Sequence, residues 1–213
     1  MSGKKVFFAF LLALISLSNF IYGDQFIIGN PASITNGLIP VNRFHNYSTY
    51  EMLYTSGEIG SECLINKIAF YKNNGSTSVL ISNVSIYMKT SSATSLPSAT
   101  IAPPYSEYTL VYSGYFPNNF GTSGWAEITL ANPYLYNANG NLHILIVKGF
   151  ENWSANKPNY TYTATGNTYL CRGGYADDSQ PENLTQNYNR PVTLFDIEFL
   201  VQNEPPLPAT ASC

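Results

Sequence analysis

The sequence predicts an all-β fold, a sandwich of two antiparallel sheets of the jelly-roll type. Three observations predict it: apolar positions recur with a period of two, β-branched and aromatic residues fill most of them, and clusters of Asn, Gly and Pro separate short segments. Beyond the apolar stretch at the N-terminus, no helical periodicity is longer than a turn. Many short strands divided by turn residues are typical of sandwiches and jelly rolls.

Residues 1–23 have the order of a secretory signal peptide. Lys4 and Lys5 precede the apolar run 6–15, and more polar residues follow. A membrane span needs about 20 unbroken apolar residues, so the sequence favours cleavage over anchoring. We expect the mature chain to begin at Asp24, directly after the small residue Gly23. It would then be secreted or held at the cell surface, without a membrane span.

The length of the segment 24–202 predicts one β-sandwich domain of ordinary size. Residues 203–213 follow it and contain Pro205, Pro206 and Pro208. That composition is typical of a semi-rigid linker, and we interpret the segment as a link to further domains of the same polypeptide or as a truncated tail.

Four strands are expected in the first half of the domain, at residues 51–55, 64–71, 84–89 and 108–113. The segment 84–89 shows the pattern best, because Val84, Ile86 and Met88 fall on one face and polar or amphipathic side chains on the other. Such alternation indicates a strand with one buried face.

Three strands are expected in the second half, at residues 125–130, 142–147 and 194–201. The segment 142–147 is apolar on nearly both faces, which predicts a central strand that is covered on two sides. Between these strands, residues 149–190 show no clear strand pattern and contain many aromatic residues. We interpret this stretch as a long loop, and long loops in compact domains are often functional.

The charge pattern argues against a nucleic-acid partner. Removal of residues 1–23 takes away two lysines and no acidic residue, which leaves 8 of the 10 basic residues against 13 acidic ones, a net charge of −5. The remaining basic residues are scattered along the chain, whereas phosphate binding requires clusters of them.

Cysteine usage predicts neither a disulfide framework nor a zinc site. Cys63, Cys171 and Cys213 are too few for a framework, and their spacing fits no zinc pattern. A bridge between Cys63 and Cys171 and two free or buried thiols both stay open, and we favour the free thiols.

No motif predicts catalysis, so we expect a protein that is not an enzyme. The only histidines are His45, in a polar stretch, and His143, inside a predicted strand between two apolar residues. Around neither histidine does the sequence show a nucleophile and an orienting acid in the pattern of a catalytic site. We expect no catalytic residue and no cofactor.

The acidic residues Asp177, Asp178 and Glu182 form a weak candidate for a calcium site, because carboxylate oxygens are the ligands that this ion prefers. No spacing among them resembles a known calcium loop. We therefore favour a solvated loop and no metal.

Eight segments, taken in their order and spacing, carry a resemblance to a known class of domain: residues 54–60, 65–71, 84–88, 110–114, 124–125, 128–130, 133–136 and 141–142. Together they resemble the jelly-roll domains of large secreted and cell-surface proteins of Bacteroidota-type bacteria. The resemblance covers roughly residues 25–201. It implies the fold, an extracellular location and a proline-containing link to another module, and it carries no catalytic motif.

Aromatic residues provide the main candidate for a binding site. Trp153 lies outside any predicted strand, and Tyr160 and Tyr162 fall on the same side of an extended segment, where they would form a flat aromatic strip beside Asn152 and Asn159. Sugar rings stack on such strips, and amides hydrogen-bond their hydroxyls. The opposing interpretation is that the tyrosines pack against the sandwich and that Trp153 closes its end.

The sequence therefore predicts a non-catalytic extracellular module for adhesion, with carbohydrate binding as the specific hypothesis and glycans or cell-surface proteins as partners. Two alternatives stay open. One is a structural spacer, and the other is an accessory domain of a larger secreted peptidase or glycosidase.

Overall fold

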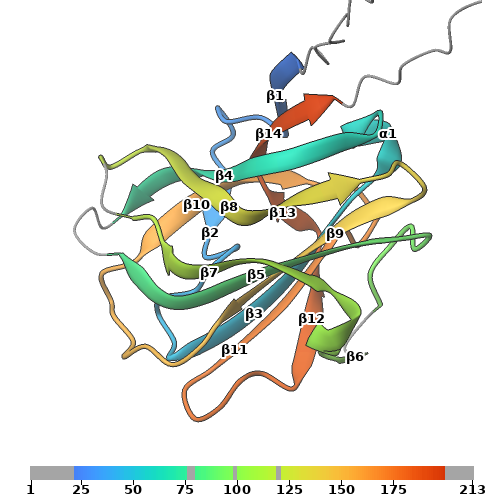
Figure 1. Ribbon diagram of the computed structural model, residues 1–213. Coiled ribbons are helices and arrows are strands. Elements are labelled where there is room, and N and C mark those ends of the chain that lie inside the picture. Colours follow the sequence, from blue (N-terminus) through green and yellow to red (C-terminus); the bar gives the residue numbers. More distant parts are fainter. Residues whose placement is uncertain (1–21, 76–79, 98–99, 119–120, 200–213) are drawn as a thin grey trace, which may run out of the picture.

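The structure is a computed structural model that describes residues 22–75, 80–97, 100–118 and 121–199. In these residues the chain forms two antiparallel sheets of seven strands each (Figure 1), which confirms the predicted all-β sandwich. The jelly-roll type of that sandwich stays a prediction.

The first sheet contains both ends of the described chain. Its strands run in the order β1 (Tyr22–Ile28), β14 (Thr193–Phe199), β4 (Cys63–Gly75), β10 (Pro158–Ala164) and β13 (Asn189–Pro191), with β8 (Gly124–Tyr136) paired to β4 and β2 (Asn36–Gly37) paired to β10.

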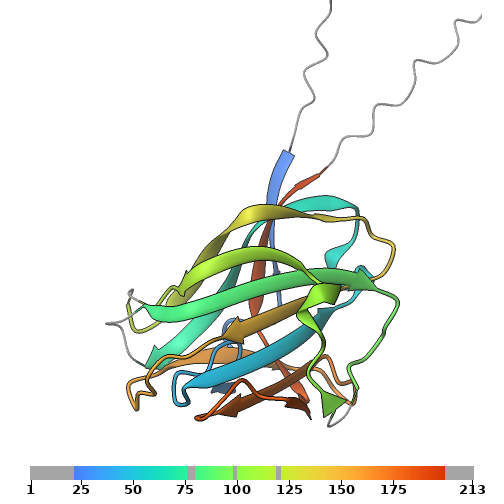
Figure 2. The same ribbon diagram turned by 60° about the horizontal axis from the view of Figure 1, so that its bottom comes forward.

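In the second sheet all seven strands follow one another in a single hydrogen-bonded order. It runs β6 (Thr100–Ile101), β12 (Asn183–Asn187), β11 (Cys171–Ala176), β3 (Tyr47–Tyr54), β9 (Asn141–Lys148), β5 (Ile81–Ser91) and β7 (Thr109–Phe116). The described residues add only a short helix α1 (Ser56–Ile59) and a 3-10 helix (Tyr105–Glu107). On one side the sheets approach each other through β7 and β8 (Figure 2), where Asn132 Nδ2 donates to the Leu110 carbonyl at 3.3 Å.

The core lies between the sheets and follows the predicted alternation. Val84, Ile86 and Met88 of β5 are fully buried in it. Strand β9 is buried along its whole length and lies between β3 and β5, which confirms that this segment is a central strand. Leu145 and Val147 on its second face pack against Tyr108.

The prediction of a long loop over residues 149–190 is wrong, because four strands, β10 to β13, lie in this stretch. Only Leu184 among their buried positions is aliphatic, and the others are Pro, Tyr, Thr, Cys and Arg, so the apolar alternation that identifies a strand is weak there. Only residues 149–157 form a loop of appreciable length before β10 begins.

The predicted termini are only partly within the described residues. Residues 1–21 of the signal peptide and the segment 203–213 lie outside them, as does Val201 of the last predicted strand. Strand β1 begins at Tyr22, two residues before the predicted mature start, and Tyr22 and Gly23 pair with Phe199 and Glu198. In the part of the chain that is described, no helix has the length and apolarity to cross a membrane.

Cys63 on β4 and Cys171 on β11 are both buried free thiols, as we favoured from the sequence. Burial raises the pKa of Cys63 to about 11 and that of Cys171 to about 12. Both thiols are therefore protonated and inert at neutral pH. Cys213 lies outside the described residues.

Candidate functional site: an aromatic loop surface

Three segments that are distant in sequence meet at one end of the second sheet, at the lower left of Figure 1. They are residues 43–46, residues 149–157 and residues 175–177. The register explains the meeting, because Tyr47 at the start of β3 pairs with Ala176 at the end of β11, and Ser48 pairs with Lys148 at the end of β9. Antiparallel pairing thus places one strand start and two strand ends side by side.

Four rings from these segments form a continuous group that we call the aromatic surface: Phe44, His45, Trp153 and Tyr175. The His45 ring stacks on Tyr175 with centroids 4.2 Å apart, and Phe44 meets His45 and Trp153 edge-on at 5.4 and 6.0 Å. Exposed fractions are 41% for Phe44, 58% for Trp153 and 56% for Tyr175. These three rings are therefore exposed to solvent while they contact one another or His45.

Asn46 holds the three segments together. Its Oδ1 accepts a hydrogen bond from the Trp153 backbone N–H at 2.8 Å, and its Nδ2 donates to the Asp177 carbonyl at 2.9 Å. Its own backbone N–H donates to Asp177 Oδ1 at 3.1 Å, and its carbonyl accepts from the Glu151 N–H. One side chain and its backbone therefore fix the positions of both neighbouring segments.

The buried Lys148 stabilises the turn that contains His45 and Asn46. Lys148 Nζ donates to the carbonyls of His45 and Asn46 at 2.8 and 2.6 Å. Burial lowers the pKa of Lys148 to about 8, which is still high enough for a charged ammonium to predominate at neutral pH. These charge-assisted bonds fix the backbone that carries His45.

Loop 149–157 is anchored to Arg43 at two points. Arg43 Nη1 donates to the Asn156 carbonyl at 2.8 Å, and the Arg43 carbonyl accepts from the Ser154 N–H at 2.9 Å. The ammonium of Lys157 lies 4.2 Å from the centre of the Phe44 ring. The rings of the aromatic surface therefore project from loops that are already ordered.

Asp177 completes the surface. His45 Nδ1 lies 3.2 Å from both of its carboxylate oxygens. The hydrogen bond from the Asn46 backbone, followed by the contact with His45, lowers the pKa of Asp177. The carboxylate is thus ionised at neutral pH and orients the ring that stacks on Tyr175.

A hollow of about 310 Å³ opens beside Tyr175, between β11, β12 and the segment 38–42. Tyr50 and Tyr162 line it, as do the amide residues Asn42, Gln186 and Asn187. Gly173 makes room for the Tyr50 ring in this wall, because a Cβ at position 173 would lie 2.0 Å from that ring. The hollow thus adds aromatic and amide groups next to the aromatic surface.

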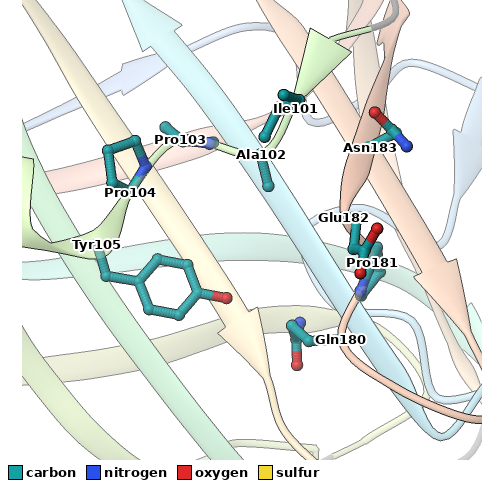
Figure 3. A pocket seen from close by; sticks show the side chains of 9 residues that line it. All are labelled: Ile101, Ala102, Pro103, Pro104, Tyr105, Gln180, Pro181, Glu182 and Asn183. Carbon is teal, nitrogen blue, oxygen red and sulfur yellow. The ribbon is translucent and has the colours of Figure 1, made fainter.

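A larger hollow of about 470 Å³ lies between residues 101–105 and 180–183 (Figure 3). Proline, alanine and isoleucine form most of its wall, and Tyr105 extends across it toward Gln180 and Pro181. Gln180 Nε2 is already bound to Thr49 Oγ1 and the Ser48 carbonyl. We assign the site to the aromatic surface instead, because three separate segments bring exposed rings together there.

The structure corrects the predicted aromatic strip. Tyr160 and Tyr162 share one face of β10, as the alternation predicts, but that face is turned to the core and they are 0% and 6% exposed. The Tyr160 ring packs edge-on against Phe116 at 5.7 Å, and the Tyr162 hydroxyl accepts the Ile39 N–H at 2.6 Å. The two tyrosines therefore stabilise the sandwich, and only Tyr162 borders a hollow.

The other predicted site residues lie in different places. Asn152 is exposed beside Trp153, in the loop that carries it. Asn159 is half-buried, and its Nδ2 donates to Asn74 Oδ1 at 2.7 Å, away from the aromatic surface. Phe44 and Tyr175 were missed, since neither stands out in a sequence with 17 tyrosines and 12 phenylalanines.

The weak metal candidates are not gathered into one site. Asp177 lies beside the aromatic surface, where its carboxylate contacts His45, whereas Glu182 lines the larger hollow. Among the described residues, no three His, Cys, Asp or Glu side chains are grouped so that they could hold a metal ion.

The fold and the site define a two-sheet β-sandwich that presents ordered aromatic rings at one end of a sheet. Comparison with protein-family models, with curated proteins and with solved structures finds no match to this chain. The resemblance to bacterial jelly-roll domains therefore stays a prediction.

Proposed function

We propose that this chain is an extracellular adhesion module that binds carbohydrate through the aromatic surface. One observation carries the proposal: exposed rings from three separate segments lie together, and hydrogen bonds among those segments fix their positions. Side chains ordered before binding lose less conformational entropy when a ligand arrives.

The chemistry of the surface suits a sugar. The C–H face of a pyranose ring stacks on an aromatic ring, and Trp153 and Tyr175 each leave more than half of their surface for such contact. Asn152 and the amides of the neighbouring hollow supply partners for hydroxyl groups. Apolar platforms with a few polar groups are the usual composition of ligand sites.

The location and the partners belong to the same proposal. The order of residues 1–23 supports secretion or display at the cell surface, where glycans and glycosylated proteins are the available partners. The Pro-rich residues 203–213 support the second candidate, an accessory domain that directs a larger secreted enzyme to its substrate. Both candidates use the same binding surface.

A glycan array tests the proposal. Purified wild-type domain is expected to bind a subset of glycans, and Trp153→Ala is expected to lose that binding with an unchanged melting temperature, because the indole is mostly in solvent. Tyr115→Ala is the matched control, since Tyr115 is also 58% exposed but lies on β7. Absence of wild-type binding, or equal loss in both variants, would contradict the proposal.

A further inference from the structure

The outer face of the second sheet holds a chain of three hydrogen-bonded side chains that the binding proposal does not use. Ser91 Oγ lies 2.8 Å from His143 Nε2, and His143 Nδ1 lies 2.8 Å from Glu51 Oε1. Glu51 and His143 are 2% and 3% exposed, whereas Ser91 is only partly buried. The three come from neighbouring strands, because β9 lies between β3 and β5.

Glu51 is held in one position by two further donors. Arg172 Nε donates to its Oε2 at 2.6 Å, and the Tyr108 hydroxyl donates to its Oε1 at 2.7 Å. Burial raises the pKa of Glu51, but the hydrogen bond from His143, the Arg172 charge and the Tyr108 hydroxyl outweigh burial and lower it to about 2. The carboxylate is therefore ionised and can only accept hydrogen bonds.

That acceptor fixes the tautomer of the histidine. His143 Nδ1 must carry a proton to donate to Glu51, so Nε2 of the neutral ring has a free lone pair. This lone pair faces the Ser91 hydroxyl, which also accepts the Ala93 N–H at 3.2 Å. A serine hydroxyl donating to a histidine whose far nitrogen is held by a carboxylate is the arrangement of a serine nucleophile.

We propose that Ser91 and His143 form a second site that cleaves small, exposed ester groups by acyl transfer. Ser91 lines neither of the two hollows described above, so we choose as substrate a short acyl group, such as acetyl, that protrudes from its carrier. We expected no catalysis from the sequence because it offered no visible partner for His143; the fold supplies both partners.

The reaction uses only an ester and water. Ser91 Oγ attacks the carbonyl carbon while His143 Nε2 takes its proton, and His143 then protonates the departing alcohol, which leaves the acyl group on Ser91. A water molecule attacks this ester with His143 again as the base, and the proton returns to Ser91 as the carboxylic acid departs. The Ala93 N–H, which donates to Ser91 Oγ at 3.2 Å, is the backbone donor that the structure places at the nucleophile.

The site is separate from the aromatic surface. Ser91 pairs with Asn141 at the start of β9, whereas the aromatic surface borders Lys148 at its end. A strand of this length spans roughly 20 Å, so the two functions can be tested independently.

The test is labelling of the folded chain with a fluorophosphonate probe, followed by mass spectrometry of the modified peptide and assay of p-nitrophenyl acetate hydrolysis. We expect the label on Ser91, and we expect both labelling and hydrolysis to fall by roughly 100-fold or more in Ser91→Ala and in His143→Gln. Ser85→Ala is the matched control: it lies on the same face of β5, but its Oγ faces Ser113 Oγ at 3.5 Å instead of a histidine.

Two results would overturn the inference. One is a wild-type protein in which Ser91 stays unlabelled, a result that needs no variant to fold. The other is a His143→Gln protein of normal melting temperature that is labelled as fast as the wild type, because its serine would then not depend on the base.

Discussion

Trp153 is the residue on which the binding proposal rests. Ordering a loop residue costs about 1–2 kcal/mol of backbone entropy, and an indole that faces solvent regains little of this through packing. The backbone of Trp153 is nevertheless fixed by Asn46, and Phe44 lies against its ring. The hydrogen bond to Asn46 therefore leaves an indole that is 58% exposed in a fixed position, where a sugar could cover it.

Tyr160 gives a prediction on stability. Its hydroxyl is buried and has no hydrogen-bond partner among the described residues, so Tyr160→Phe is expected to raise the free energy of unfolding by about 1 kcal/mol. Tyr162→Phe is the matched comparison and should lower it by about 1–3 kcal/mol, because the Ile39 N–H would lose its acceptor. Urea unfolding measures both, and a destabilised Tyr160→Phe variant with intact Tyr162 would contradict the assignment.

Glu51 gives a prediction on pH. Its pKa of about 2 in the folded chain is below the ordinary 4.5, so its ionisation stabilises the fold above pH 4.5 and this contribution is lost as the pH falls toward 2. The wild type should therefore lose about 3 kcal/mol more than Glu51→Gln between pH 5 and pH 2.

Urea unfolding at both pH values measures this difference. Glu127→Gln is the control, since Glu127 forms an exposed ion pair with Lys67 and should leave the pH dependence as in the wild type. Equal losses in the wild type and in Glu51→Gln would show that the carboxylate is not held as described.

Among the elements, β9 connects the core to both sites. Ile144 is fully buried in it, and Ile144→Asp is expected to unfold the domain, because a buried unpaired charge costs several kcal/mol, about the whole stability of a domain. Ile34→Asp is the control, since Ile34 is 90% exposed. Circular dichroism during heating measures both; an Ile144→Asp domain that melts like the wild type would contradict the central place of β9.

The sequence predicted those strands whose buried positions are aliphatic, such as β5 and β9. It did not predict β11 or β12, whose sequences CRGGYA and NLTQN show no apolar alternation. β11 pairs with β3 and with β12. This pairing depends on contacts between strands that are distant in sequence, and the local residue pattern does not reveal them. Of the candidate site, Trp153 was identified because it lies in a true loop.

The rest of the site depends on contacts between distant segments. Phe44, Trp153 and Tyr175 are neighbours only because β3, β9 and β11 pair in one register, and a single sequence does not reveal that register. For the same reason, the partners of His143 were not visible, since Glu51 and Ser91 lie on the strands to either side of β9.

At the scale of the whole molecule, the two proposed sites lie at opposite ends of the second sheet. Its loop end presents the aromatic surface, and its other end holds Ser91 and His143 on the outer face. An adhesion module with this arrangement would hold a glycan at one end and act on an ester at the other.

The fluorescence of Trp153 tests the central claim most directly. The chain has two tryptophans, so Trp125→Phe leaves Trp153 as the only one. Titration of this variant with a glycan selected on the array is expected to shift the emission to the blue in a saturable manner, because the sugar removes water from the indole. Saturable binding of the same glycan, measured by calorimetry, with no change in the Trp153 emission would contradict the claim.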